Sequence, residues 1–123
     1  MSEKVIQVSL AVMFVGSGGN TRDGRYFYSF TPAVVDVTEP DTEIVYTLSE
    51  ETPKRFVIAD LYANDVGMTL RGKKVDAQQR SLSVINKNSE HQLVILSLLV
   101  LDGDTRINCD PQMTNSPTRP PTE

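Results

Sequence analysis

The sequence predicts a single all-β domain, and three observations predict it. Apolar and polar residues alternate in several short runs, which is the period of a strand with one buried face. Clusters of Gly, Pro, Asn and Asp separate these runs. Beyond a possible helical turn at 76–80, no segment follows the period of a helix. We therefore expect about seven to nine strands in one antiparallel β-sandwich, immunoglobulin-like or jelly-roll-like.

The first strand is expected over 5–15, where Ile6, Val8 and Leu10 alternate with polar neighbours. A basic residue before this apolar run is also a feature of signal peptides. Glu3 and the polar interruptions argue against one, and no small-residue cleavage site follows. The next segment, 16–25, contains four glycines and is expected to be a long hairpin loop. It lacks the Gly-Lys-Ser/Thr ending of a phosphate-binding loop.

Further strands and turns follow along the chain. An aromatic strand over 26–30 has Tyr26, Tyr28 and Phe30 on one face. Other strands are expected at 33–37, 43–48, 55–61, 68–70 and 81–87, with turns at 38–41, 49–53, 64–67 and 86–89. The run 91–101 is apolar on both faces, which predicts a central strand covered on both sides, followed by a turn at 102–104. We assign residues 1–104 to the sandwich core. Residues 105–123 form a Pro-containing C-terminal segment, expected to dock on the same domain as an edge strand.

Composition excludes several classes of function. The formal net charge is −4 and no run of Lys and Arg occurs, so we expect no nucleic-acid partner. One cysteine and one histidine exclude an intrachain disulfide and a zinc site of ordinary ligand count. We expect no metal and no cofactor. The run 93–101 is too short to cross a bilayer, so no membrane partner is expected. Low cysteine content fits a cytoplasmic protein, which is the location we expect.

The dipeptide Asp110-Pro111 carries the most specific chemistry in the sequence. The Asp110 carboxyl group can close onto its own carbonyl carbon as a cyclic anhydride and release the Pro111 nitrogen. A scaffold that holds this geometry raises the rate of such an intramolecular step by orders of magnitude. Asp and Pro are also common turn residues, so a loop corner is the simpler interpretation.

Two acidic-proline pairs, Glu39-Pro40 and Asp110-Pro111, together with the chain length and the β pattern, resemble the small bacterial DP-EP family. The resemblance implies a β-sandwich in which single-turnover, aspartic-type self-cleavage at Asp-Pro has been proposed. It also implies a Lys–Asp isopeptide cross-link and suggests Glu39 as the acid. A cross-link needs a lysine whose pKa is lowered by burial. Lys87 is the nearest candidate in sequence.

Other interpretations remain open. The domain could be a non-enzymatic interaction or assembly module, whose edge strands pair with a second copy or with a protein partner of unknown identity. It could also bind a small ligand through the 16–25 loop or through the aromatic cluster at 26–28. His91 is expected to be a surface or capping residue, and Cys109 a small buried apolar group.

Overall fold

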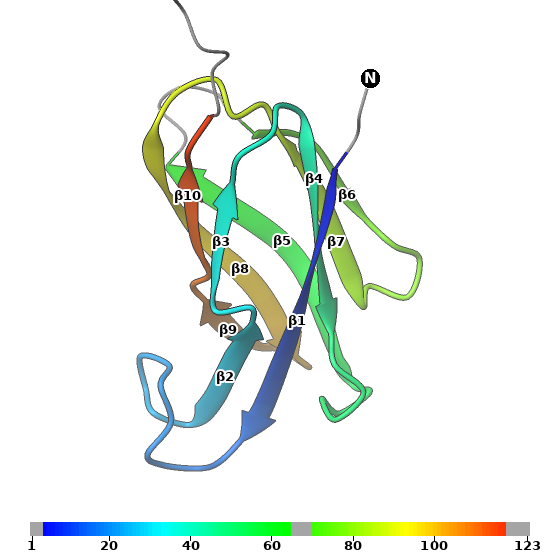
Figure 1. Cartoon of the computed structure of the whole chain (residues 1–123). Helices are drawn as coiled ribbons and strands as arrows, with labels where there is room; N and C mark the ends of the chain where they lie inside the picture. The colour runs from blue at the N-terminus through cyan, green and yellow to red at the C-terminus, as the bar shows by residue number, and fades with distance from the viewer. Residues whose placement is uncertain (1–3, 65–69, 118–123) are drawn as a thin grey trace, which may run out of the picture.

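The computed structural model describes residues 4–64 and 70–117, and these form two β-sheets packed face to face (Figure 1). The predicted all-β sandwich is confirmed, and the described residues contain no helix. The strands are β1 (Val5–Phe14), β2 (Tyr26–Thr31), β3 (Val34–Val37), β4 (Thr42–Leu48), β5 (Phe56–Asn64), β6 (Leu70–Val75), β7 (Ser81–Asn86), β8 (Gln92–Asp102), β9 (Thr105–Cys109) and β10 (Gln112–Asn115).

The first sheet has the strand order β2-β1-β4-β7-β6, and the second has the order β3-β10-β8-β5, with β9 also paired to β8. Pairing is mostly antiparallel, but β1 runs parallel to β4 and β3 runs parallel to β10. The sheets are therefore mixed, whereas the sequence predicts antiparallel pairing throughout. The difference arises because the chain crosses between the two sheets after β2 and after β3, so that β4 returns to the first sheet beside β1.

The core lies between the sheets and is built by the predicted alternation. In β4 and β7 every second residue is buried, which places Ile44, Tyr46 and Leu82 in the interior. Tyr26, Tyr28 and Phe30 face the core, with Tyr28 and Phe30 packed edge to face at 5.7 Å between ring centroids. Phe27 is exposed on the opposite face of the same strand. The aromatic strand thus supplies core side chains, as the sequence indicates.

The predicted helical turn at 76–80 is wrong, because these residues form the hairpin turn between β6 and β7. The Asp76 carboxylate accepts hydrogen bonds from the backbone N–H groups of Arg80 and Ser81, and Gln79 takes a positive φ of 58°. Side-chain bonding of this kind by Asp is a common way to close a tight turn. The break predicted at 64–67 and the start of the strand predicted at 68–70 lie largely outside the described residues.

The first half of strand β8 is more exposed to solvent than the sequence predicts. Leu93 and Ile95 are 64% and 58% exposed, because no element of the described ranges packs on the outer face of the sheet at this point. Leu98, Leu99 and Val100 are buried, as expected of a central strand. The outer face of the second sheet therefore carries apolar side chains that face solvent.

Strands β9 and β10 are two halves of one extended segment along β8. Leu98 pairs with Cys109 and Ile95 pairs with Gln112, so the register is unchanged across the break and Asp110-Pro111 lies level with Leu96 and Ser97. Burial alternates in phase through the break, with Pro111 buried and Asp110 exposed. Proline has no N–H to donate, which explains why the ladder is interrupted here. Strand β10 lies between β8 and β3, so the predicted edge strand is wrong for residues 112–115, whereas β9 pairs only with β8 among the described residues.

Candidate ligand-binding cleft

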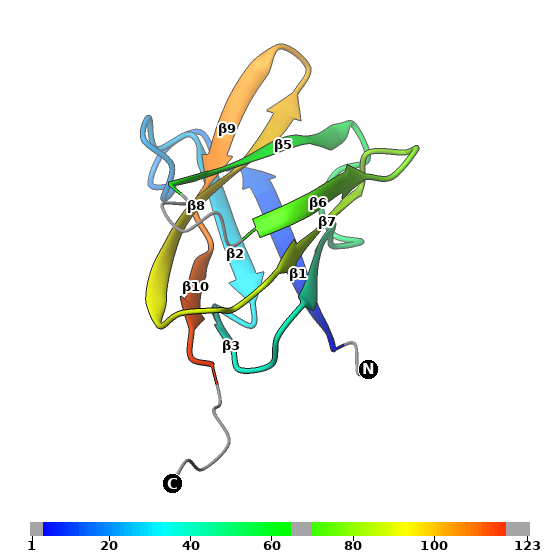
Figure 2. The same ribbon diagram turned by 90° about the horizontal axis from the view of Figure 1, so that it is seen from above.

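The glycine-rich loop between β1 and β2 is folded back on itself and held by its own backbone. Val15 N–H donates to the Arg25 carbonyl at 2.8 Å, and Gly19 N–H donates to the Gly24 carbonyl at 2.9 Å. A Cβ atom at Gly19 would lie 2.0 Å from the Tyr26 carbonyl oxygen, so only glycine fits there. The loop lies beside β9 in both views of the molecule (Figures 1 and 2).

Side chains of the loop complete this fixation. The Asn20 amide donates to the Tyr28 carbonyl, and its oxygen accepts from Tyr28 N–H, each at 2.8 Å. The Asp23 carboxylate accepts from the Arg25 backbone N–H at 3.0 Å and from the Thr21 hydroxyl at 3.1 Å. These bonds, the backbone N–H above all, lower the pKa of Asp23 from its usual value, so the carboxylate stays charged at neutral pH. The loop is therefore ordered before any ligand arrives.

The fixed loop and strand β9 together enclose a cleft of about 870 Å³, called here the polar cleft. On β9 the outward-facing side chains are Arg106 and Asn108, and Asp110 continues the same face just after the strand, because every second residue of an extended segment lies on one face. Arg22 lines the cleft from the loop side, and Tyr28 from β2. Residues of both sheets thus meet at one concave site.

Several charged groups in the polar cleft have no partner among the described residues. Neither Arg22 nor Arg106 forms a hydrogen bond or an ion pair there, and the Asp110 carboxylate accepts no hydrogen bond. In contrast, Asp23 and Asn20 are fully engaged in holding the loop. The cleft therefore presents two guanidinium donors and one carboxylate acceptor for an external ligand.

Tyr28 connects the cleft to the interior. Its hydroxyl oxygen accepts a hydrogen bond from the backbone N–H of Asp110 at 3.2 Å. Burial raises the pKa of Tyr28 above its usual value, so the phenol keeps its proton at neutral pH. A phenol can accept one hydrogen bond and donate another, which leaves its own O–H available as a donor in the cleft.

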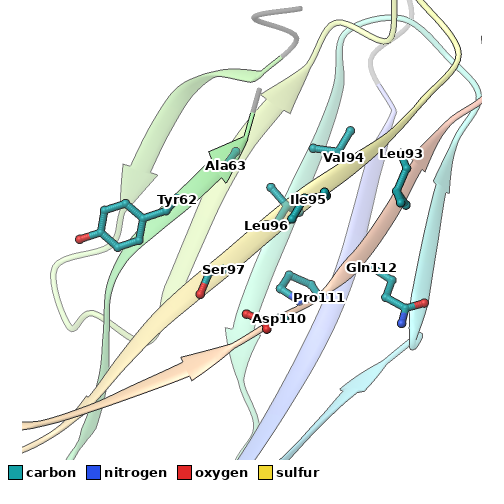
Figure 3. A pocket seen from close by; sticks show the side chains of 10 residues that line it. All are labelled: Tyr62, Ala63, Leu93, Val94, Ile95, Leu96, Ser97, Asp110, Pro111 and Gln112. Atoms are coloured by element: carbon teal, nitrogen blue, oxygen red, sulfur yellow. The ribbon is translucent and has the colours of Figure 1, made fainter. Parts of the chain in front are cut away.

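A second depression, called here the apolar groove, adjoins the polar cleft. It has a volume of about 740 Å³, and its apolar walls include Tyr62, Leu93 and Ile95. Figure 3 shows Asp110 and Ser97 at one end of the groove and Leu93 at the other. Because Asp110 and Ser97 line both depressions, they form the boundary between a charged region and an apolar one.

The structure does not bring the residues predicted for self-processing together. Glu39 lies at the end of β3 that is level with Asn115, and its carbonyl oxygen accepts from the Asn88 amide at 3.3 Å. Lys87 lies at the same end, where its carbonyl accepts from Asp41 N–H. Asp110 precedes the opposite end of β10, roughly 20 Å away at ~3.3 Å per strand residue. Self-cleavage and the isopeptide remain predictions.

Neither Lys73 nor His91 contacts the Asp110 side chain, and the Cys109 thiol lies on the opposite, buried face of the same extended segment. Lys73 contacts Asp60 across the edge of the sandwich, with Nζ and Oδ1 2.5 Å apart. His91 is exposed and acts electrostatically on Asp36, beside β10. Cys109 is fully buried, and burial raises the pKa of its thiol to about 12, which keeps it protonated and unreactive.

The sequence did not indicate Arg22 and Arg106 as site residues, and it did not predict the apolar groove. The alternation of Arg106, Asn108 and Asp110 is a visible strand signal, but the turn interpretation of Asp110-Pro111 concealed it. Among the described residues no group of three metal-ligating side chains is found. Within the same ranges there is also no helix long and apolar enough to cross a membrane.

Comparison with known proteins adds no family to this description. No protein-family model matches the sequence, and no curated protein matches it either.

Proposed function

We propose that this domain is a non-enzymatic binding domain and that the polar cleft recognises a carboxylate group of its ligand. Guanidinium groups bind carboxylates through paired, charge-assisted hydrogen bonds. Arg22 and Arg106 line one cleft and have no other partner among the described residues. Asp110 nearby and the net charge of −4 favour a singly charged carboxylate over a phosphate dianion.

The observation that carries this proposal is a contrast within one loop. Its polar groups with structural roles, in Asn20, Thr21 and Asp23, are all hydrogen-bonded inside the protein. Arg22, between two of them, has no such role. A rigid loop that presents an unused charged side chain over a concave surface is the usual arrangement of a binding loop. Of the two small-ligand sites considered from the sequence, the 16–25 loop and the aromatic cluster at 26–28, this proposal uses the loop, together with β9.

Calorimetric titration with N-acetyl-Gly-Gly-Gly as probe tests this function, with the carboxamide form of the same peptide as comparison. We expect the free carboxylate to bind at least about tenfold more tightly, because a charge-assisted hydrogen bond contributes ~1.5–3 kcal/mol. Arg106→Gln and Arg22→Gln should each weaken binding of the carboxylate form about tenfold. Added salt should weaken it as well.

Lys87→Gln is the matched control, because Lys87 is an exposed cation distant from the polar cleft. It should leave the affinity unchanged. Equal binding of the carboxylate and carboxamide forms, or full affinity in Arg106→Gln, would contradict the proposed function.

A further inference from the structure

The polar cleft and the apolar groove adjoin each other. Asp110 and Ser97 line both depressions. Beyond them, Ile95 and Leu93 are among the most exposed apolar side chains of the described residues. A ligand held at Arg22 and Arg106 can therefore extend over Asp110 onto an apolar surface.

We infer that the ligand is the carboxyl-terminal end of a polypeptide, bound in extended form with an apolar side chain in the groove. This inference rests on the proposed function of the polar cleft. Three kinds of group on this surface each favour a different group on the ligand. The arginines can pair with an anion, the Asp110 carboxylate can accept from a hydrogen-bond donor, and Ile95 can pack against an apolar group. A peptide end offers its carboxylate, its backbone N–H groups and its side chains in this order.

The spacing along the sheet indicates which peptide residue is apolar. Ile95 is level with Gln112, six strand positions from Arg106, or ~20 Å along the strand at ~3.3 Å per residue. The side chains of Arg106, of Ile95 and of the ligand's apolar residue each cover several ångströms of this distance. About 10 Å then separates the carboxylate from the apolar contact, which three extended residues cover. The apolar side chain is accordingly expected at the third residue from the peptide's end.

Three probes test the inference by calorimetric titration on the full chain. N-acetyl-Leu-Gly-Gly should bind about tenfold more tightly than N-acetyl-Gly-Gly-Gly, because part of the leucine side chain leaves water. Decanoate carries a carboxylate and an apolar tail but no N–H donor, so it should bind more weakly than the leucine peptide. In Ile95→Ser the leucine peptide and the glycine peptide should bind with nearly equal affinity, so the tenfold preference is lost.

Val5→Ser is the matched control, because Val5 is a comparably exposed apolar residue on the other sheet. It should leave the tenfold preference intact. Equal affinity for the leucine and glycine peptides would overturn the inference while leaving the proposed carboxylate site standing. Decanoate binding as tightly as the leucine peptide would also overturn it, in favour of a fatty-acid-like ligand. Failure of every carboxylate probe to bind would overturn both.

Discussion

The backbone N–H of Asp110 donates to the hydroxyl oxygen of Tyr28 at 3.2 Å. This bond joins the interrupted strand of the second sheet to β2 of the first sheet, at the base of the polar cleft. It satisfies a backbone donor at the point where Pro111 interrupts the ladder. The same bond orients the phenol so that its own proton is available to a ligand.

Replacing Tyr28 with Phe should weaken ligand binding while preserving the fold. The change removes one acceptor for Asp110 and one donor in the cleft, and each neutral hydrogen bond contributes ~1 kcal/mol. We expect about a fivefold loss of affinity for N-acetyl-Gly-Gly-Gly by calorimetry. The aromatic packing on Phe30 does not need the hydroxyl, so the far-ultraviolet circular dichroism spectrum should not change. Unchanged affinity would mean that Tyr28 has no part in the site.

Arg80 is expected to be a main source of stability. Its guanidinium donates to four backbone carbonyls, those of Ser49, Thr52, Pro53 and Phe56, at 2.9–3.2 Å. Lysine keeps the charge but cannot reproduce this planar set of donors. We expect Arg80→Lys to lower the free energy of unfolding in urea by about 2–3 kcal/mol.

Arg71→Lys is the control for Arg80, since Arg71 forms an exposed ion pair with Asp41. Such pairs contribute little, and we expect a change below about 0.5 kcal/mol. Similar effects of the two lysine variants would argue against a special role for Arg80.

Asp102 should make the stability depend on acid pH. Its carboxylate accepts from Arg55 Nε and from the Tyr26 hydroxyl, each at 2.7 Å. These bonds, the one from Arg55 most, lower the pKa of Asp102 below its unfolded value. A carboxyl group with a lowered folded pKa contributes its stability above the unfolded pKa of about 3.9 and loses it as the pH falls through the folded pKa.

Urea unfolding of the wild type and of Asp102→Asn between pH 2 and pH 7 measures this contribution. We expect the variant to be less stable by about 1–2 kcal/mol at pH 7, and the difference to shrink below pH 4. Asp41→Asn, in the exposed pair with Arg71, should have little effect at any pH. If the free energies of unfolding of wild type and Asp102→Asn differed by the same amount at every pH, the stabilising role of the ionised Asp102 carboxylate would be contradicted.

The geometry predicts that the Asp110-Pro111 bond stays intact at neutral pH. Asp110 is exposed to solvent, and neither Glu39 nor Lys87 is near it. Intact-mass spectrometry after days at pH 7 should give one full-length mass, the same for wild type and Asp110→Asn apart from the substitution itself. Release of a 111–123 fragment from the wild type alone would support the self-cleavage that the family resemblance implies.

Much of the fold could be predicted from the sequence because alternation is a local signal. The alternating residues of β4 and β7 and the central ones of β1 are visible in the sequence and are buried as expected. The parallel pairing of β1 with β4 was not predictable, because it depends on where the chain crosses between sheets. Residues 105–115 also alternate, yet Asp110-Pro111 looks like a turn when its neighbours across the sheet are unknown.

The candidate site was less predictable for the same reason. The 16–25 loop was identified as a possible ligand loop, but its partner surface on β9 is about eighty residues further along the chain. Leu93 and Ile95 are exposed because nothing in the described part of the chain covers them, and no local sequence pattern reveals this. Arg22 and Arg106 look like ordinary surface charges until the fold places both at one cleft.

Nuclear magnetic resonance of the nitrogen-15-labelled protein, titrated with N-acetyl-Leu-Gly-Gly, tests the central claim most directly. The account predicts saturable shifts of backbone amides at 20–28, 93–97 and 106–112, with the arginine side-chain signals of Arg22 and Arg106 moving together. Amides of β6 and of the turn that leads into β7, three strands from β2 in the first sheet, should not move. Shifts that are absent from 20–28 and 106–112, or spread evenly over the surface, would contradict the assignment of this cleft as the binding site.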